Sequence, residues 1–260
     1  MIGLDFGFGA LEAEFWRLLF VMTRIGAAML AAPLFGAATV PPQVRVIVTG
    51  AIAVLICAWM PVTAPAALLS LQGMVIVAGE VLIGLALGFV LQIAFAAPVM
   101  AAEVIGGSMG MSMAVAVDPN NGAQSPTLGQ YFTVVLTLIF LALGAHLQWI
   151  ALLLESYRVF PPGETWLGAD KFSDIAAFGG TLFATAVMIA LPVSLVLLVV
   201  QLVTGILSRS APALNLFALG LPAGVLAGLA ALIAAYPIIT DQMADLSATA
   251  VAESRSILVR

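Results

Sequence analysis

The chain has 260 residues, of which 63% are hydrophobic and 8% are charged, with a formal net charge of -5 at pH 7 and a mean hydropathy of +1.20. Because charged residues make up roughly a quarter of a soluble globular domain, this composition excludes that class and indicates an all-α membrane-associated protein. No basic run occurs, which argues against a nucleic-acid partner and against electrostatic attachment to anionic lipid.

The first predicted helix covers residues 15–32 and contains two arginines, Arg17 and Arg24, which are seven residues apart and share one face. Arginine inside a bilayer is costly unless its head reaches the interface or finds a partner. We expect Arg17 to reach the interface and Arg24 to face protein. Pro33 and the prolines at 41–42 end this helix.

The next two apolar runs have unusual lengths for membrane spans. Residues 46–60 follow Arg45 and would extend roughly 22 Å at ~1.5 Å per residue, short of the ~30 Å hydrocarbon core. Residues 74–102 form a run longer than one span requires. Within it, Gly84 and Gly88 are four residues apart, a spacing that permits close helix approach.

Glu80 is a carboxylate inside the longer run. One interpretation is an ion or proton path, in which Glu103 would be the second relay group. The other is a structural bond to Arg24, to Arg45 or to the backbone of a neighbouring subunit. We favour the structural bond, because no second carboxylate shares the helical face of Glu80.

A glycine- and methionine-rich stretch, residues 106–122, separates this run from the next and is predicted to be a loop. In an extended backbone, Met109, Met111 and Met113 would point to one side. Flexible thioethers seal against surfaces of varying shape, and neighbouring glycines allow sharp turns. Residues 118–122 then predict a turn. The stretch is either a plug in a conduit or an ordinary connection between helices.

The remaining chain predicts one further helix at residues 131–154, a polar stretch at 155–180, and a helical hairpin with arms at 181–203 and 214–239. A polar tail after residue 240 predicts a solvated helix. The second arm of the hairpin carries three glycines at four-residue spacing, a smooth stripe for tight packing: Gly220, Gly224 and Gly228.

Residues suited to catalysis or metal binding are few. Cys57 is the only cysteine, so no internal disulfide can form, and its apolar surroundings indicate a small buried side chain. His146 is the only histidine, which excludes a metal site built from imidazoles of this chain; we interpret it as a hydrogen-bonded packing residue. Residues 5–14 are acidic and aromatic and predict no cleavable signal. We expect no enzyme and no cofactor.

Several of these motifs together resemble the FliR family of the flagellar export gate, to which counterparts in virulence type III secretion also belong. The resemblance extends over nearly the whole chain, and its most specific part is the run at 208–222. Departures occur at Ala213 and at Ala223, where polar or basic residues are expected. The motifs are Arg24 with Pro33, Pro41 with Arg45, Glu80 with Gly84 and Gly88, Glu103 before the glycine loop and Asp118–Pro119, Gly144 with His146, Ser156 with Tyr157, and Arg209, Pro212, Asn215, Gly220 and Pro222 around the hairpin turn.

The resemblance implies one FliR-type domain over residues 1–260, with about six apolar helices in hairpins. Residues 1–180 would be a FliP-like part containing the plug loop, and residues 181–260 a FliQ-like hairpin with a polar tail. The domain would pack into a helical ring with several copies of FliP and FliQ, near FlhB and FlhA and membrane lipid, in the inner membrane at the flagellar basal body.

The resemblance also implies a function without catalysis: unfolded flagellar proteins pass through the ring, and the loop closes its pore. The alternative is a secondary transporter or ion channel that uses Glu80 and Glu103 and breaks its helices at Pro98 and Pro192. The implied plug residues are Gly106, Gly107, Met109, Gly110, Met111, Met113, Asp118 and Pro119.

Overall fold

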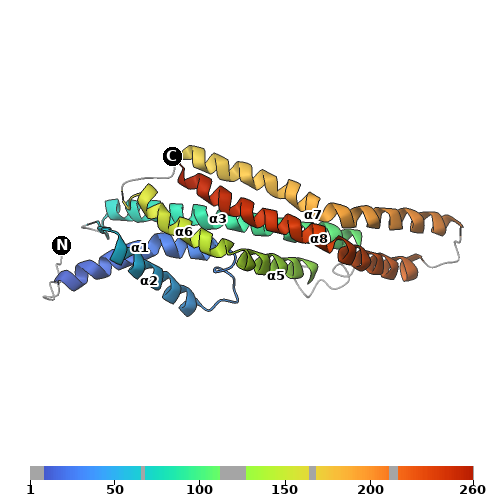
Figure 1. Ribbon diagram of the computed structural model, residues 1–260, viewed down its shortest axis with the longest axis horizontal. Coiled ribbons are helices and arrows are strands. Elements are labelled where there is room, and N and C mark those ends of the chain that lie inside the picture. Colours follow the sequence, from blue (N-terminus) through green and yellow to red (C-terminus); the bar gives the residue numbers. More distant parts are fainter. Residues whose placement is uncertain (1–8, 66–67, 112–126, 164–167, 211–215, 260) are drawn as a thin grey trace. The chain divides into compact units, whose positions relative to one another are not determined.

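The computed structural model describes residues 9–65, 68–111, 127–163, 168–210 and 216–259, and every regular element in them is helical. The all-α fold class is thus confirmed, with seven helices in the described residues where about six were expected. They are α1 (Gly9–Ala31), α2 (Pro42–Trp59), α3 (Leu71–Ser108), α5 (Thr127–Ala142), α6 (Ala145–Val159), α7 (Ala169–Ser210) and α8 (Leu216–Leu258) (Figure 1).

The chain folds as two compact units, each assembled from segments that are distant in sequence. Unit 1 contains Met1–Ile93, His146–Phe178 and Ala250–Arg260, and unit 2 contains Ala94–Ala145 and Gly179–Thr249. Helices α3, α7 and α8 contribute to both units. This grouping does not follow the expected parts 1–180 and 181–260, and that division remains a prediction.

Within the described ranges, four helices are long and apolar enough to cross a membrane: α2, α3, α7 and α8. Helices α5 and α6 would make a fifth span if the two together count as one broken span. Helix α2 is longer than the apolar run that predicted it, because it begins at Pro42. Proline suits the first turn of a helix, where its missing N–H has no intrahelical acceptor to lose.

Two predicted boundaries were wrong. Helix α3 continues through Ser108, so Gly106 and Gly107 are helical and the connection starts later than expected. Residues 131–154 do not form one helix, because the chain breaks after α5 at Gly144, whose φ is +66°. Glycine adopts this left-handed conformation without the Cβ penalty of other residues, and it commonly ends helices.

The last two helices extend further than the hairpin predicted. Helix α7 starts at Ala169 and absorbs much of the polar stretch, with Asp170 in its first turn, where a carboxylate complements the helix dipole. Helix α8 includes the polar tail up to Leu258. The tail is helical, as expected, but one side of it is buried and includes Met243, Leu246 and Ile257, so it is not simply solvated. Their spacing matches an amphipathic helix.

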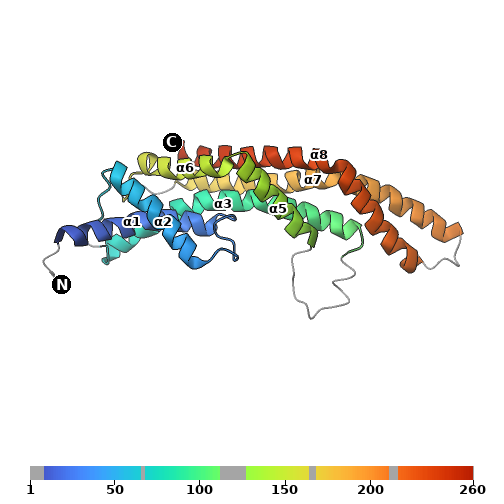
Figure 2. The ribbon, with the colours of Figure 1, turned by 60° about the horizontal axis from the view of Figure 1, so that its bottom comes forward.

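Unit 1 has its core where α1, α2, α3 and α6 meet. Figures 1 and 2 show α1 and α2 side by side, and the described contacts agree. Trp149 of α6 is fully buried, donates its indole N–H to Leu87 O at 3.2 Å and stacks on Phe35 with ring centroids 6.0 Å apart. One aromatic side chain thereby joins α6, α3 and the segment after α1.

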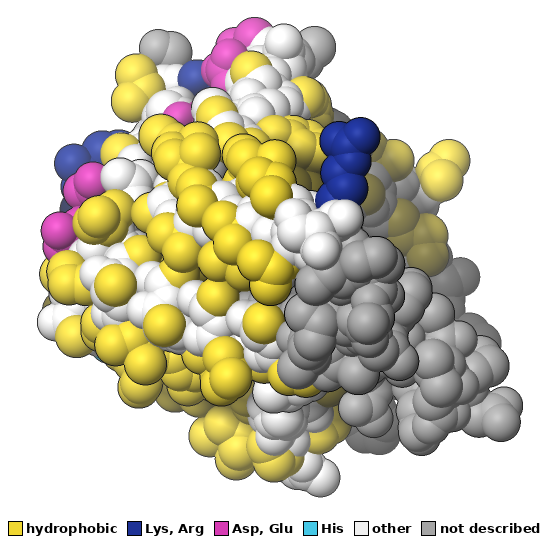
Figure 3. Space-filling view, turned by 90° about the vertical axis from the view of Figure 1, so that its right-hand side faces the viewer, with side chains coloured by type: hydrophobic (Ala, Val, Ile, Leu, Met, Phe, Trp, Pro, Cys, Tyr) yellow, Lys and Arg dark blue, Asp and Glu magenta, His cyan; other side chains and the backbone are white. Residues whose placement is uncertain are grey.

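Unit 2 contains the end of α3, α5 and the hairpin of α7 and α8. Phe95 of α3 meets Phe140 of α5 edge to face, with centroids 5.6 Å apart. Much of α7 in this unit leaves apolar side chains uncovered, and Figure 3 shows one face of the molecule on which such side chains dominate. Those of α7 include Phe183, Val187, Leu195, Val199, Leu202 and Ile206.

Candidate functional site

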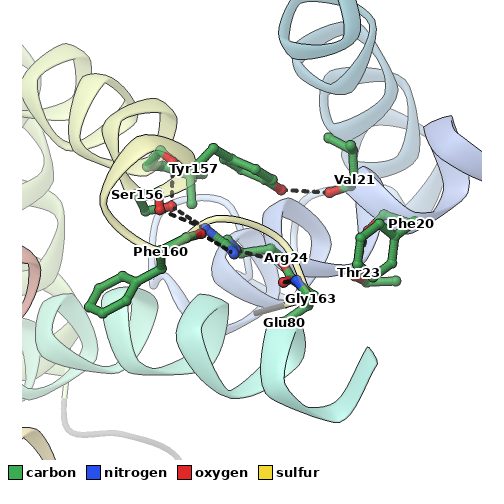
Figure 4. Close-up of polar contacts among 10 residues, drawn as sticks. Phe20, Val21, Thr23, Arg24, Glu80, Ser156, Tyr157, Phe160 and Gly163 are labelled. Carbon is green, nitrogen blue, oxygen red and sulfur yellow. Dashed lines mark hydrogen bonds and ion pairs between the residues drawn. The ribbon is translucent and has the colours of Figure 1, made fainter. Parts of the chain in front are cut away.

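A buried arginine joins three parts of unit 1. Arg24 on α1 is 0% exposed. Its Nε donates to Glu80 Oε2 of α3 at 2.8 Å, Nη1 donates to Ser156 O at 2.8 Å, and Nη2 donates to Phe160 O at 2.9 Å (Figure 4). Charge-assisted bonds of this kind are about twice as strong as neutral ones, which offsets the cost of burying the charge. The expectation that Arg24 faces protein is confirmed.

Both carboxylate oxygens of Glu80 are occupied. Oε2 accepts from Arg24, and Oε1 accepts from the backbone N–H of Gly163 at 3.1 Å. Of the partners for Glu80 that the sequence left open, Arg24 is the one that bonds to it. Arg45 is only partly buried and donates to Ala37 O at 2.5 Å. Glu103 is exposed, so it is not the buried charge expected. Each oxygen of the Glu80 carboxylate is therefore used in a structural bond.

Tyr157 completes the network around Arg24. Its hydroxyl donates to Val21 O at 2.7 Å, and its ring lies 4.2 Å from Arg24 Cζ, a cation–π distance (Figure 4). The side chain therefore binds α1 at two points from α6. Sequence motifs contained Ser156 and Tyr157 but gave no indication of the backbone acceptors, because carbonyl groups leave no residue pattern.

Two glycines bring Glu80 to Arg24. A methyl group on Gly84 would collide with Arg24 O, and one on Gly88 would lie 2.5 Å from Ala28 O. The backbones of α3 and α1 therefore pack with no room for a side chain between them, as the four-residue spacing predicts. Since Glu80 precedes Gly84 by one helical turn, this approach places its carboxylate beside α1.

One expectation for a single residue was wrong, and another stays a prediction. Arg17 Nη2 donates to Cys57 O at 2.6 Å and to Met60 O at 2.8 Å, and a position of Arg17 at the membrane interface stays a prediction. These carbonyls belong to the end of α2, which lacks intrahelical donors, so the guanidinium caps it. His146 Nδ1 is buried without a hydrogen-bond partner in the described part of the chain. The histidine packs, but this nitrogen makes no bond.

In unit 2, the start of the predicted plug is a capped helix end. Gly110 N–H donates to Gly107 O and Met111 N–H donates to Gly106 O, both at 3.0 Å, and Gly110 has φ +82°. This pairing is a Schellman motif, which needs a left-handed residue at Gly110. The backbone at 109–111 is therefore a turn, and the expected extended alternation is wrong there. Met113, Asp118 and Pro119 lie outside the described residues.

Met109 is 3% exposed and packs against α8. A methyl group added to Gly228 would lie 2.5 Å from Met109 Cγ and 2.8 Å from its Sδ and Cε, and one added to Gly224 would lie 3.2 Å from Met109 O. Of the predicted stripe, Gly228 thus faces the thioether of Met109, and Gly224 faces its backbone carbonyl. A methyl group on Gly220 would meet nothing within 4 Å.

Met109 and Met111 also border an apolar cavity of about 550 Å³ in the same unit. Its walls come from α5 and α8, and two tyrosines supply hydroxyl groups. Such a cavity has the size of a small-ligand site but few polar groups to orient one. The wall residues are Thr127, Leu128, Tyr131, Phe132, Val135, Leu229, Leu232, Ile233, Tyr236, Ile239 and Met243.

The hairpin turn is described only at its flanks. Arg209 is exposed in the last turn of α7, while Gly220 and Pro222 lie in α8. Pro212 and Asn215 lie outside the described residues. Helices α3 and α7 both continue through their internal prolines, Pro98 and Pro192, so neither proline breaks its helix as the transporter interpretation required.

In the described residues, the polar and charged groups of the site serve packing. Within the described ranges, no group of three or more histidine, cysteine, aspartate or glutamate side chains could hold a metal ion. The buried ionic groups are bonded to one another and to backbone atoms. Fold and site together define a helical, membrane-class protein of the bacterial export proteins, whose family 1 matches residues 15–250.

The chain belongs to the FliR family, whose members are export proteins and not enzymes. It is similar to the flagellar biosynthetic protein FliR of Escherichia coli (strain K12), with 33% identity over 229 residues that cover 88% of this chain and 86% of that protein. FliR of Bacillus subtilis (strain 168) is 33% identical over 211 residues, 80% of this chain and 81% of the relative. FliR of Caulobacter vibrioides is 29% identical over 219 residues, covering 82% and 85%.

Proposed function

We propose that this chain is a core subunit of the flagellar type III protein export gate and forms, with FliP and FliQ, the pore through which unfolded flagellar proteins pass. The observation that carries this proposal is the family match over residues 15–250. It is supported by the flagellar biosynthetic proteins that the chain matches over most of their length. The gate lies in the bacterial inner membrane at the flagellar basal body, where FlhA and FlhB are further partners.

Assembly with helical partners is supported by uncovered apolar surface. Helices α3 and α7 have 38 and 42 residues, well beyond the ~20 that cross a bilayer. Apolar surface that stays exposed along helices of this length indicates contacts with protein or lipid. The buried Arg24–Glu80 pair also suits a protein surrounding, since isolated charges in lipid are costly.

The Met/Gly segment that starts at Met109 closes the pore in this proposal. Support comes from the buried thioether of Met109 and from the apolar cavity that Met109 and Met111 border. Closure by a few buried side chains, at ~1.5 to 3 kcal/mol each, is weak enough for an incoming chain to displace. Thioether packing is not directional, so closure by such contacts favours no particular exported sequence.

Deleting residues 110–115 tests the plug. We expect the variant to assemble, because α3, α5 and the hairpin keep their own contacts, but to leak small ions. Membrane conductance in cells that carry the deletion is the measurement, and the amount of complex extracted in mild detergent is its control. Unchanged conductance with a normal amount of complex would contradict the plug, while leaving membership of the gate intact.

A further inference from the structure

The start of the Met/Gly segment is held by both arms of the hairpin in unit 2. Gln201 of α7 donates its side-chain N–H to Ser108 O at 2.9 Å. Met109, the next residue, lies against Gly224 and Gly228 of α8. Ser108 and Met109, consecutive residues at the end of α3, thus contact two different helices.

The bond from Gln201 satisfies the carbonyl of Ser108 at the end of α3. The Schellman motif uses the carbonyls of Gly106 and Gly107, and Ser108 O, one residue further, has no intrahelical donor among the described residues. The Gln201 amide supplies that donor. The bond therefore depends on α7 lying beside the end of α3, and it is lost if the two separate.

The contact at Gly228 is a steric fit to one side chain. The three atoms nearest to a methyl group there would be Met109 Cγ, Sδ and Cε at 2.5–2.8 Å, all atoms of a flexible side chain. Alanine at 228 should therefore displace Met109 and leave the backbone of α8 in place. The glycines facing α1 differ, because a methyl group at Gly84 would meet backbone.

We propose that Gln201 and Gly228 are positioning residues that hold residues 108–111, from which the proposed plug continues, against the two arms of the hairpin. This inference rests on the proposed plug function. The two arms contact adjacent residues. Moving α7 away from α3 breaks the bond from Gln201, and moving α8 away removes the packing of Gly228 on Met109.

The test uses a reporter cysteine in the assembled complex. The chain carries Cys57→Ala, which removes the only native thiol, and Met111→Cys, next to the cavity. Gly228→Ala and Gln201→Leu are compared with Gly180→Ala, where an added methyl group meets nothing within 4 Å. The measurements are the rate of maleimide labelling at position 111 and the small-ion conductance of the membrane.

We expect Gly228→Ala to raise the labelling rate about five- to tenfold and Gln201→Leu about two- to tenfold, while Gly180→Ala leaves it unchanged. In a Met109→Ala background, Gly228→Ala should add nothing, because the clashing atoms are gone. Labelling that stays at the parent rate in both single variants would overturn the inference. So would an equal effect of Gly228→Ala with and without Met109.

The two readouts separate this inference from the proposed function. Faster labelling with unchanged conductance supports the positioning role and counts against the plug. If Gly228→Ala abolishes assembly, Met109→Ala should restore it by making room. Failure of that rescue would overturn the inference, because Gly228 would then be needed for packing other than with Met109.

Discussion

At the scale of single residues, Arg24 makes the strongest demand on its surroundings. A guanidinium with 0% exposure must have its charge and its N–H groups satisfied, and Glu80, Ser156 and Phe160 supply these bonds. Breaking such a pair by removing one partner typically costs about 3–5 kcal/mol, because a buried charge is left alone. The pair is therefore a structural requirement of unit 1.

Replacing Glu80 tests this role against a proton relay. Glu80→Gln leaves Arg24 without its counter-charge, and we expect destabilisation of about 3–5 kcal/mol, seen as a loss of assembled complex. The measurement is the amount of chain recovered with its partners, followed by export of flagellar protein. Glu155→Gln, at an exposed acid on α6, is the matched control and should assemble normally. A relay instead predicts a normal amount of complex with export abolished.

At the scale of elements, the contact between α1 and α3 depends on Gly84 and Gly88. Gly84→Ala would put a methyl group against Arg24 O, a backbone atom that cannot turn aside. We expect about 1–3 kcal/mol of destabilisation, the usual cost of overpacking, and a lower unfolding temperature of the extracted complex. Gly179→Ala, with nothing within 4 Å, is the control. Equal unfolding temperatures for the two variants would show that α1 and α3 separate easily.

The elements also show what can be predicted from sequence. The apolar runs located the described helices, except that one run, 131–154, covers both α5 and α6; hydrophobic burial sets where helices form. Their ends were harder: Gly106 and Gly107 suggested a loop, but the helix stop is Gly110, whose left-handed conformation caps it. Gly144 ended α5 for the same backbone reason. A positive φ is a property of the folded chain and leaves no mark on composition.

The candidate sites divide in the same way. Charge at membrane depth indicated that Arg24 faces protein, since the cost of an unpaired charge is general. The backbone carbonyls of Ser156 and Phe160 that accept from Arg24, and the Gly163 N–H that donates to Glu80, follow from no pattern of side chains. Alternation predicted one face for the methionines. The extended backbone behind that prediction is absent at 109–111, where the chain turns, although Met109 and Met111 both border the same cavity.

At the scale of the whole molecule, the uncovered apolar surface predicts dependence on partners. Side chains such as Phe183, Leu202 and Ile206 remain largely exposed on α7. We expect the chain expressed alone to aggregate in mild detergent and to become well dispersed when FliP and FliQ are present. Size-exclusion chromatography with a native mass measurement compares the two preparations. A stable, monodisperse monomer of the single chain would contradict this prediction.

The bonds of Arg24 have a consequence for biosynthesis. They connect it to residues 56, 132 and 136 positions later in the chain. Arg24 therefore leaves the ribosome long before its acceptors exist. Until they are made, burying its unpaired charge in lipid would be costly. Helix α1 is made first, but Arg24 completes its bonds only after Phe160 has been made. A nascent chain that ends before Phe160 still lacks one of these bonds.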